Sequence, residues 1–242
     1  MNVRVAISLF LITWVYDLNA NAEDQTAKLP DDGWWIRYSW NEKTEVNGVF
    51  RGEYTEKMTC SLVGTRTEDG EKCRWVELNR VWSLENKERI SLYKILIPEK
   101  DLLESEKPLG GLKRGWFKNG DFDVRAIKLG QEIKSNSNLL RFFPGRWQKT
   151  ERLDKARNVD YQKGRLSISE ARTRTDKTAI TTRAQIEEST AWFDPITAPV
   201  FSYACFRIKN DGNDDKLNFS KEIEMVIEDI GNEAQSKMPD NN

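Results

Sequence analysis

The chain has 242 residues, and 38 Lys and Arg stand against 39 Asp and Glu, which gives a net charge of −1. Apolar residues make up 38% and charged residues 32%, a balance that suits a folded domain and excludes the disordered and membrane classes. The sequence contains no histidine, which excludes Ser-His-Asp and Cys-His catalysis and any His-ligated metal.

The first element in chain order is an export signal, predicted over residues 1–22. A short basic start precedes an apolar run of 11 residues at 5–15, and Ala20-Asn21-Ala22 matches an A-x-A cleavage site. The run is too short to span a bilayer, which needs about 20 residues. We therefore expect an exported protein, periplasmic or secreted, with no transmembrane segment after cleavage. A buried N-terminal helix or an uncleaved anchor is the alternative.

The next segments indicate β-structure. Residues 23–32 are polar and predict a flexible lead, and residues 33–40 form an aromatic run typical of a strand. Asp69-Gly70 then stands between two β-rich arms, which predicts a two-residue hairpin turn. A strand over 89–97 is expected to end at Pro98, followed by a short helix through 99–103.

The three cysteines, Cys60, Cys73 and Cys205, are interpreted as small buried apolar residues. An odd count leaves at least one thiol free. The predicted hairpin places Cys73 opposite Arg66, and Cys60 then lies about 20 Å further along its arm. A bridge between Cys60 and Cys73 would break that register. A bridge from Cys205 to either stays open.

The last element, 220–230, fits two patterns. Alternating apolar residues favour a strand, whereas Ile223, Val226, Ile227 and Ile230 also match a helical spacing. The neighbouring turn signals favour the strand, on which Val226 would face the wrong side and need cover. From residue 232 on, the sequence predicts a frayed tail.

The fold class is therefore mainly β (α+β): a large antiparallel sheet, curved or partly closed into a half-barrel, with one or two short helices. No linker or repeat divides the chain, so 33–231 is expected to be a single β-rich domain followed by the tail 232–242. Residues 134–183 carry 13 basic and 5 acidic side chains, and residues 184–242 carry 5 basic and 12 acidic ones. These charges would either offset each other across the sheet or offer a basic surface to an anionic envelope partner.

No motif marks a catalytic or metal site. Ser91 and Lys94 match the S-x-x-K pattern, but on a strand positions three apart face opposite ways. Asp211 opens a calcium-loop pattern in which Lys216 replaces the required glycine. The chain is therefore interpreted as a protein without cofactor and not as an enzyme. Carboxylate-pair hydrolysis needs no histidine and remains an alternative.

Tryptophans provide the candidate ligand-lining residues: Trp34, Trp35 and Trp75. Adjacent strand residues face opposite sides, so only one of Trp34 and Trp35 can enter a core unless both faces are covered. The other would line an apolar concavity or a sugar-stacking face, and core packing with a covered second face is the alternative.

Short segments at 33–38, 61–64, 71–75, 95–100, 161–166 and 229–236 share a further pattern. They resemble an uncharacterised family of exported bacterial proteins of the planctomycete type. The segment 192–200 is similar to a hairpin of periplasmic lipoprotein-carrier (LolA-like) domains. This second resemblance implies a curved antiparallel half-barrel that holds an acyl chain in an apolar concavity. It carries over no ligand-binding residue.

The leading hypothesis is an exported, non-catalytic carrier-type domain for an apolar or amphiphilic ligand. An envelope protein-interaction or structural component is the second hypothesis, and the histidine-free hydrolase is the third. Export disfavours a nucleic-acid partner. The oligomeric state is left open.

Overall fold

The structure is a computed structural model. It describes residues 28–84, 87–103, 109–128, 151–153, 155–180, 183–194, 197–200, 203–214 and 218–238. The predicted export signal over 1–22 lies outside the described residues.

The described chain is almost entirely β, as predicted. The strands are β1 Trp35–Val46, β2 Val49–Glu68, β3 Glu71–Leu84, β4 Lys87–Pro98, β5 Arg114–Asn119, β6 Arg125–Ala126, β7 Glu151–Leu153, β8 Arg157–Tyr161, β9 Gly164–Ile168, β10 Ala171–Ile180, β11 Arg183–Phe193, β12 Tyr203–Asp214 and β13 Asn218–Gly231. One helix lies among the described residues, α1 Glu99–Leu103.

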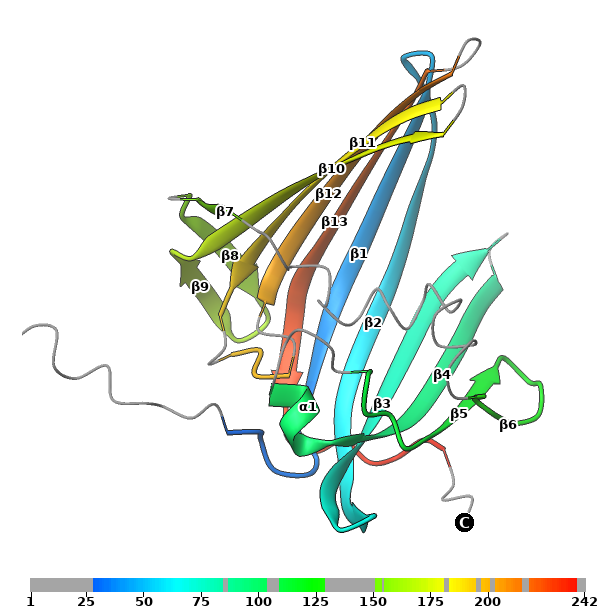
Figure 1. The fold of residues 1–242 in the computed structure, drawn as a ribbon, viewed down its shortest axis with the longest axis vertical. Helices are drawn as coiled ribbons and strands as arrows, with labels where there is room; N and C mark the ends of the chain where they lie inside the picture. The colour runs from blue at the N-terminus through cyan, green and yellow to red at the C-terminus, as the bar shows by residue number, and fades with distance from the viewer. Residues whose placement is uncertain are drawn as a thin grey trace, which may run out of the picture.

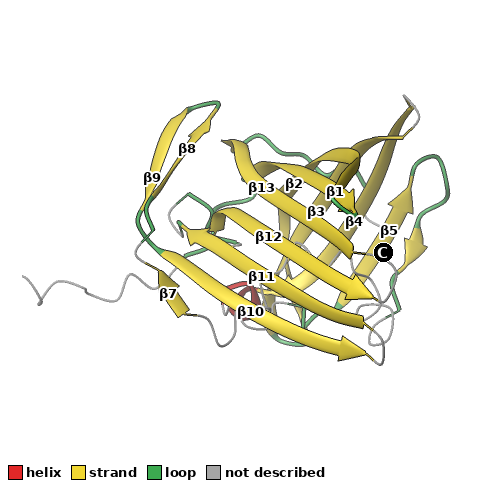
Figure 2. Cartoon of the chain, turned by 90° about the horizontal axis from the view of Figure 1, so that it is seen from above, coloured by secondary structure: helices red, strands yellow, loops and turns green. Residues whose placement is uncertain are grey.

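Eleven strands form one antiparallel sheet in the order β6-β5-β4-β3-β2-β1-β13-β12-β11-β10-β7, and β8 and β9 form a separate hairpin. Two meanders thus meet at the β1–β13 pair, which joins the start of the chain to its end (Figure 1). Within the described residues β6 and β7 are the two edges and do not pair, so the sheet is not closed into a barrel. The expected large, curved antiparallel sheet is confirmed, and Figure 2 shows its curvature; we call the concave side of this sheet the trough.

The predicted Asp69-Gly70 hairpin is confirmed. Both residues have positive φ, 49° and 77°, as a two-residue turn with the twist of the strands requires. Arg66 lies opposite Cys73, which is the register expected from the sequence. The β1–β2 turn uses the same device at Asn47 and Gly48, with φ of 53° and 72°.

The short helix follows β4 where it was expected. β4 ends at Pro98, and α1 begins at Glu99 with two acidic residues in its first turn, which suits the helix dipole. Leu102 is buried, and the Arg74 guanidinium reaches Glu99 at 3.4 Å, so β3 holds the start of the helix.

Residues 218–231 form a strand and not a helix, which decides between the two patterns of this segment. Ile223 lies opposite Glu42 of β1 and Ile208 of β12. Val226 is on the other face and is half-buried, packed against the core, so it has the cover that the strand interpretation requires.

The sheet has two faces that differ in their side chains. We call inner face the one that carries Tyr38 and Trp40 of β1, and outer face the opposite one. Register places these buried side chains on the inner face as well: Met58, Cys60 and Leu62 of β2, Val76 and Leu78 of β3, Tyr93, Ile95 and Ile97 of β4, Phe206 of β12, and Met225 and Ile227 of β13.

Two segments cover parts of the outer face. The β8–β9 hairpin lies over β13, where Arg157 donates to Glu224 at 2.7 Å and Gln162 N–H donates to the Glu228 carbonyl at 2.9 Å. Residues 232–238, expected to be frayed, instead cross the outer face. The Glu77 carboxylate on β3 accepts hydrogen bonds from the backbone N–H groups of Lys237 and Met238.

The charge asymmetry is partly offset within the fold. Arg157 of the basic segment donates to Glu224 of the acidic segment at 2.7 Å, and β10 and β11, which come from the two segments, pair along their length. At the N-terminal end, Leu29 of the lead is buried and the Pro30 carbonyl accepts from Arg74 at 2.7 Å.

No helix in the described ranges has the length and apolar character to cross a membrane.

Candidate functional site

The inner face of β1, β13 and the start of β2 is apolar at the base of the trough and again at its far end. Trp40 is 1% exposed and Ile223 is 7% exposed, whereas Phe219 is 37% and Val49 is 54% exposed. Register places all four on this face, because Val46 lies opposite both Phe219 and Val49. An apolar path thus leads from the surface at the hairpin ends to the core.

One charged rung crosses this apolar path. Lys221 of β13 pairs with Glu42 of β1, with Nζ 2.7 Å from Oε1, and their side chains are 30% and 18% exposed. Glu42 lies opposite Ile223, and Lys221 lies opposite Thr44. The pair therefore separates the buried base of the path from its exposed end.

Aromatic side chains fill the base. The Tyr38 hydroxyl donates to the Tyr203 carbonyl at 3.0 Å, and burial raises the pKa of Tyr38 well above its ordinary value. Trp40 meets Phe206 edge to face with ring centroids 5.5 Å apart. These contacts join β1 to β12 across β13, which requires the inner face to be concave here.

A buried ion pair lies beside this aromatic cluster. Glu56 of β2 accepts from Arg80 of β3 through Nε at 3.0 Å and Nη2 at 2.5 Å, and from the Tyr54 hydroxyl at 2.7 Å. The Glu56 side chain is 0% and the Arg80 side chain 7% exposed. Burial and the hydrogen bond to Glu56 raise the pKa of Tyr54, so its hydroxyl remains a donor.

The three predicted ligand-lining tryptophans do not share the inner face. Trp35 lies on the outer face over Gly231, with the Arg37 guanidinium 5.3 Å from its ring centroid. Trp75 is also on the outer face, 5.2 Å from Trp116. Trp34 precedes β1 and is half-buried against the core. The sequence indicates that Trp34 and Trp35 face opposite ways, but it does not indicate which face of the sheet is concave.

The cysteines are three buried free thiols. Cys60 lies opposite Leu78, so it is far from Cys73 along the hairpin. Burial raises the pKa of Cys60 well above its ordinary value and that of Cys205 to about 12, so neither forms a reactive thiolate near neutral pH.

Two sequence patterns acquire a plain structural role. Ser91 and Lys94 face opposite sides of β4: Ser91 donates to Asn119 at 3.2 Å, and Lys94 donates to the Met238 carbonyl at 3.1 Å. Asp211 accepts from Ser220 and pairs with Lys209 at 2.9 Å. Across the described ranges, no group of three Cys, Asp or Glu side chains is arranged to hold a metal.

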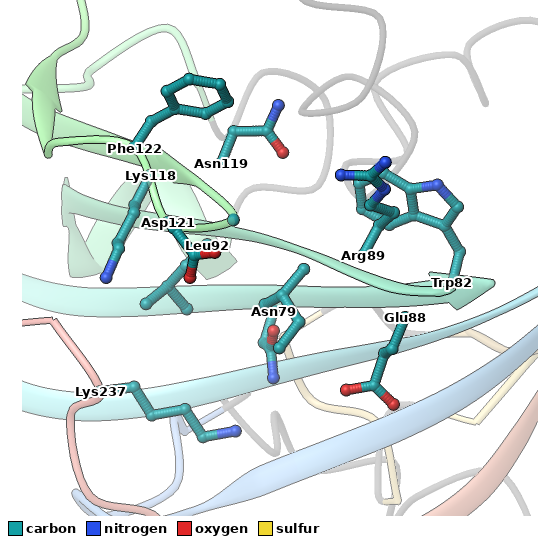
Figure 3. A pocket seen from close by; sticks show the side chains of 12 residues that line it. Asn79, Trp82, Glu88, Arg89, Leu92, Lys118, Asn119, Asp121, Phe122 and Lys237 are labelled. Carbon is teal, nitrogen blue, oxygen red and sulfur yellow. The ribbon is translucent and has the colours of Figure 1, made fainter. Parts of the chain in front are cut away.

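A pocket of about 800 Å³ lies at the N-terminal end of β4, beyond the point where β5 stops pairing with it (Figure 3). Its walls come from β3, β4, the turn after β5 and the C-terminal segment. The lining residues are Asn79, Trp82, Glu88, Arg89, Ile90, Leu92, Lys118, Asn119, Gly120, Asp121, Phe122 and Lys237. This pocket could not be predicted from the sequence, because its residues come from four segments that only the sheet order brings together.

Comparison with known proteins supplies no identity. No protein-family model matches the chain. No curated protein matches it either.

Proposed function

We propose that this chain is an exported, non-catalytic carrier-type protein that binds an amphiphilic ligand on the inner face of its trough. The observation that supports the proposal most directly is the apolar path along β1, β13 and the start of β2, on which the exposed fraction of the side chains rises from 1% at Trp40 to 54% at Val49. Exposed apolar side chains at the open end would admit an acyl chain, and the aromatic base would hold its end.

The open sheet supports this use. A carrier must take up and release its ligand, and a trough whose edge strands do not pair in the described residues can widen more easily than a closed barrel. Apolar surface left exposed on a monomer commonly marks a binding site, and Val49 and Phe219 are two large apolar side chains exposed on this face.

The Glu42–Lys221 rung supports an amphiphilic ligand over a purely apolar one. The pair lies on the same face as the apolar path and is partly exposed, with Nζ and Oε1 2.7 Å apart. A polar headgroup passing this point would find one donor and one acceptor. A hydrocarbon without polar groups would displace water from the Glu42–Lys221 pair and offer it no hydrogen bonds in return.

Titration with the fluorescent fatty acid cis-parinaric acid tests the ligand class. We expect saturable binding. Phe219→Ser should weaken it by about five-fold, because the substitution removes part of the apolar contact between the ligand and one aromatic ring. Phe122→Ser is the matched control, because Phe122 is 67% exposed and lies at the β4 pocket instead. Absence of saturable binding, or equal weakening by both variants, would reject the proposal.

Export is tested separately from binding. The intact mass of protein recovered from the producing bacterium should correspond to a chain that begins at Glu23, after Ala22. A cytoplasmic protein that retains residues 1–22 would contradict export and leave the binding proposal to be judged on the titration.

A further inference from the structure

Apolar side chains are exposed where two hairpins end at the far end of the sheet. This end comprises residues 46–50 between β1 and β2 and residues 218–219 at the start of β13, and we call it the tip. Val49 is 54%, Phe50 57% and Phe219 37% exposed. We propose that the tip is a membrane-docking site that inserts these side chains into the surface of a lipid bilayer. This site does not depend on the carrier function proposed above.

The tip lies at one extremity of the molecule. Figure 1 shows the β1–β2 turn and the start of β13 together at the upper end, separated from α1 by the length of the strands. Val46 lies opposite both Val49 and Phe219, so the two hairpins end at the same level. A surface in this position can meet a flat bilayer.

The exposed apolar side chains project from both faces of the sheet. Val49 and Phe219 are on the inner face, whereas Phe50 is on the outer face because it lies opposite Glu45. A protein partner that packs against a sheet covers one of its faces, but a fluid bilayer surrounds whatever enters it. The two-sided exposure therefore favours lipid over a protein surface.

The fold orients the Phe219 ring. Gly212 of β12 lies opposite Phe219, and a Cβ added at Gly212 would overlap the ring. The ring thus packs directly on the backbone of β12, and the remaining part of its surface faces outward. An aromatic side chain held in this way loses little conformational entropy when lipid covers it.

The backbone of the tip suits an environment with little water, because two of its N–H groups are paired within it. The Asn47 N–H donates to the Asn218 carbonyl at 2.7 Å, and the Asn218 N–H donates to the Asn47 Oδ1 at 2.9 Å. An N–H group without a partner is costly to move into an apolar medium. The same two hydrogen bonds tie the two hairpins into one unit.

Ion pairs on both faces set the depth of insertion. On the outer face Lys43 pairs with Glu53 at 3.9 Å, and on the inner face Lys221 pairs with Glu42 at 2.7 Å. Val46 lies three residues beyond Lys43, about 10 Å along an extended strand. Interfacial elements bury their apolar side chains about 5–10 Å into a bilayer, so these pairs remain in water.

The charges at the level of the apolar side chains cancel. Glu45 and Arg51 are exposed there, and neither forms an ion pair with another described residue. Both can stay among lipid headgroups, and the arginine stem can lie along the apolar surface. Binding should therefore depend on apolar contact and not on lipid charge, so salt should not weaken it.

Sedimentation with phosphatidylcholine vesicles in high salt tests the proposal on the protein purified from its own cells. We expect saturable binding. Phe50→Ser should weaken it by about five-fold, because more than half of this side chain is exposed and available to lipid. Phe122→Ser is the matched control: Phe122 is 67% exposed but lies after β5, so this variant should bind like the wild type. All three proteins share one N-terminus, which contributes equally to each.

Phe50→Ser also separates the tip from the inner-face path. Because Phe50 is on the outer face, the variant should keep the wild-type Tm and affinity for cis-parinaric acid. Phe219→Ser should weaken the binding of both vesicles and fatty acid, since Phe219 belongs to the tip and to the path. Fatty-acid binding without vesicle binding would overturn the membrane proposal alone.

Two further outcomes would overturn the proposal. The first is binding that requires anionic lipid and disappears in high salt, because charge would then hold the protein on the membrane. The second is equal vesicle affinity of Phe50→Ser and Phe122→Ser, because the tip would then not be the surface that binds.

Discussion

The buried Glu56–Arg80 pair allows the sharpest prediction for stability. Glu56→Gln keeps the shape of the side chain and removes its charge, so the Arg80 guanidinium stays buried without a counterion. The Glu56 side chain is 0% exposed and Arg80 donates two hydrogen bonds to it. Breaking one partner of such a buried pair costs about 3–5 kcal/mol. For a chain of this size, each kcal/mol lowers Tm by about 2–4 °C, so Tm should fall by about 6–20 °C.

A double-mutant cycle completes this test by thermal and urea unfolding. Arg80→Met should destabilise the protein in the same way, because it leaves the Glu56 carboxylate buried without a counterion, with the Tyr54 hydroxyl as a neutral donor. The double variant should be more stable than the sum of the two losses predicts. Asp160→Asn removes an exposed ion pair with Arg165 and should change Tm little. A loss below about 1 kcal/mol for Glu56→Gln, or strictly additive losses, would refute this reasoning.

Three further predictions follow from local geometry. Hydrogen bonds from Lys100 and Lys113 lower the pKa of Glu71 from 4.5 to about 2. The Glu71 carboxylate therefore contributes fully to stability above about pH 4.5, and this contribution is lost as the pH falls through about 2. Between about pH 4.5 and 2, Tm should fall less for Glu71→Gln than for the wild type. Native protein should expose no thiol to iodoacetamide at pH 8, and mass spectrometry after denaturation should count three modified cysteines; a single modified cysteine would reveal a disulfide. Gly33→Ala should destabilise by about 1–3 kcal/mol in urea unfolding, because φ is 92° and the new Cβ would lie 2.5 Å from the Asn232 carbonyl oxygen; an unchanged midpoint would contradict this.

Local signals predicted the elements of this fold well. Asp69-Gly70 has few low-energy alternatives to a tight turn. A two-residue turn also fixes which residues of β2 and β3 lie opposite each other, so the register could be predicted with it. Pro98 ends a strand and suits a helix start for steric reasons, so α1 could be located from one residue. These features depend on neighbouring residues alone.

The site required information that alternation does not contain. A period of two says that Trp35 and Ile36 face opposite ways, but not which side becomes concave. The β1–β13 pairing decides it, and that pairing joins residues almost 200 positions apart, such as Trp35 and Gly231. The tail from residue 232 was expected to be frayed, and only the position of the Glu77 carboxylate shows why residues 232–238 are held.

Charged side chains inside the trough were missed for a related reason. Glu56 and Arg80 occupy the positions of a regular alternating pattern that a sequence reading assigns to apolar residues. They meet because Met58 lies opposite Arg80 and Trp82 lies opposite Glu56, which makes the two charged residues diagonal neighbours on adjacent strands. Cross-strand register is thus the level at which the candidate sites become visible.

Native mass spectrometry of the protein purified from its own cells, before and after solvent extraction, tests the central proposal most directly. An amphiphilic carrier should retain a co-purifying acyl species that extraction removes, with a change in tryptophan fluorescence near Trp40. A spectrum at the mass of the chain alone, unchanged by extraction and by added fatty acid, would contradict the account of the inner face.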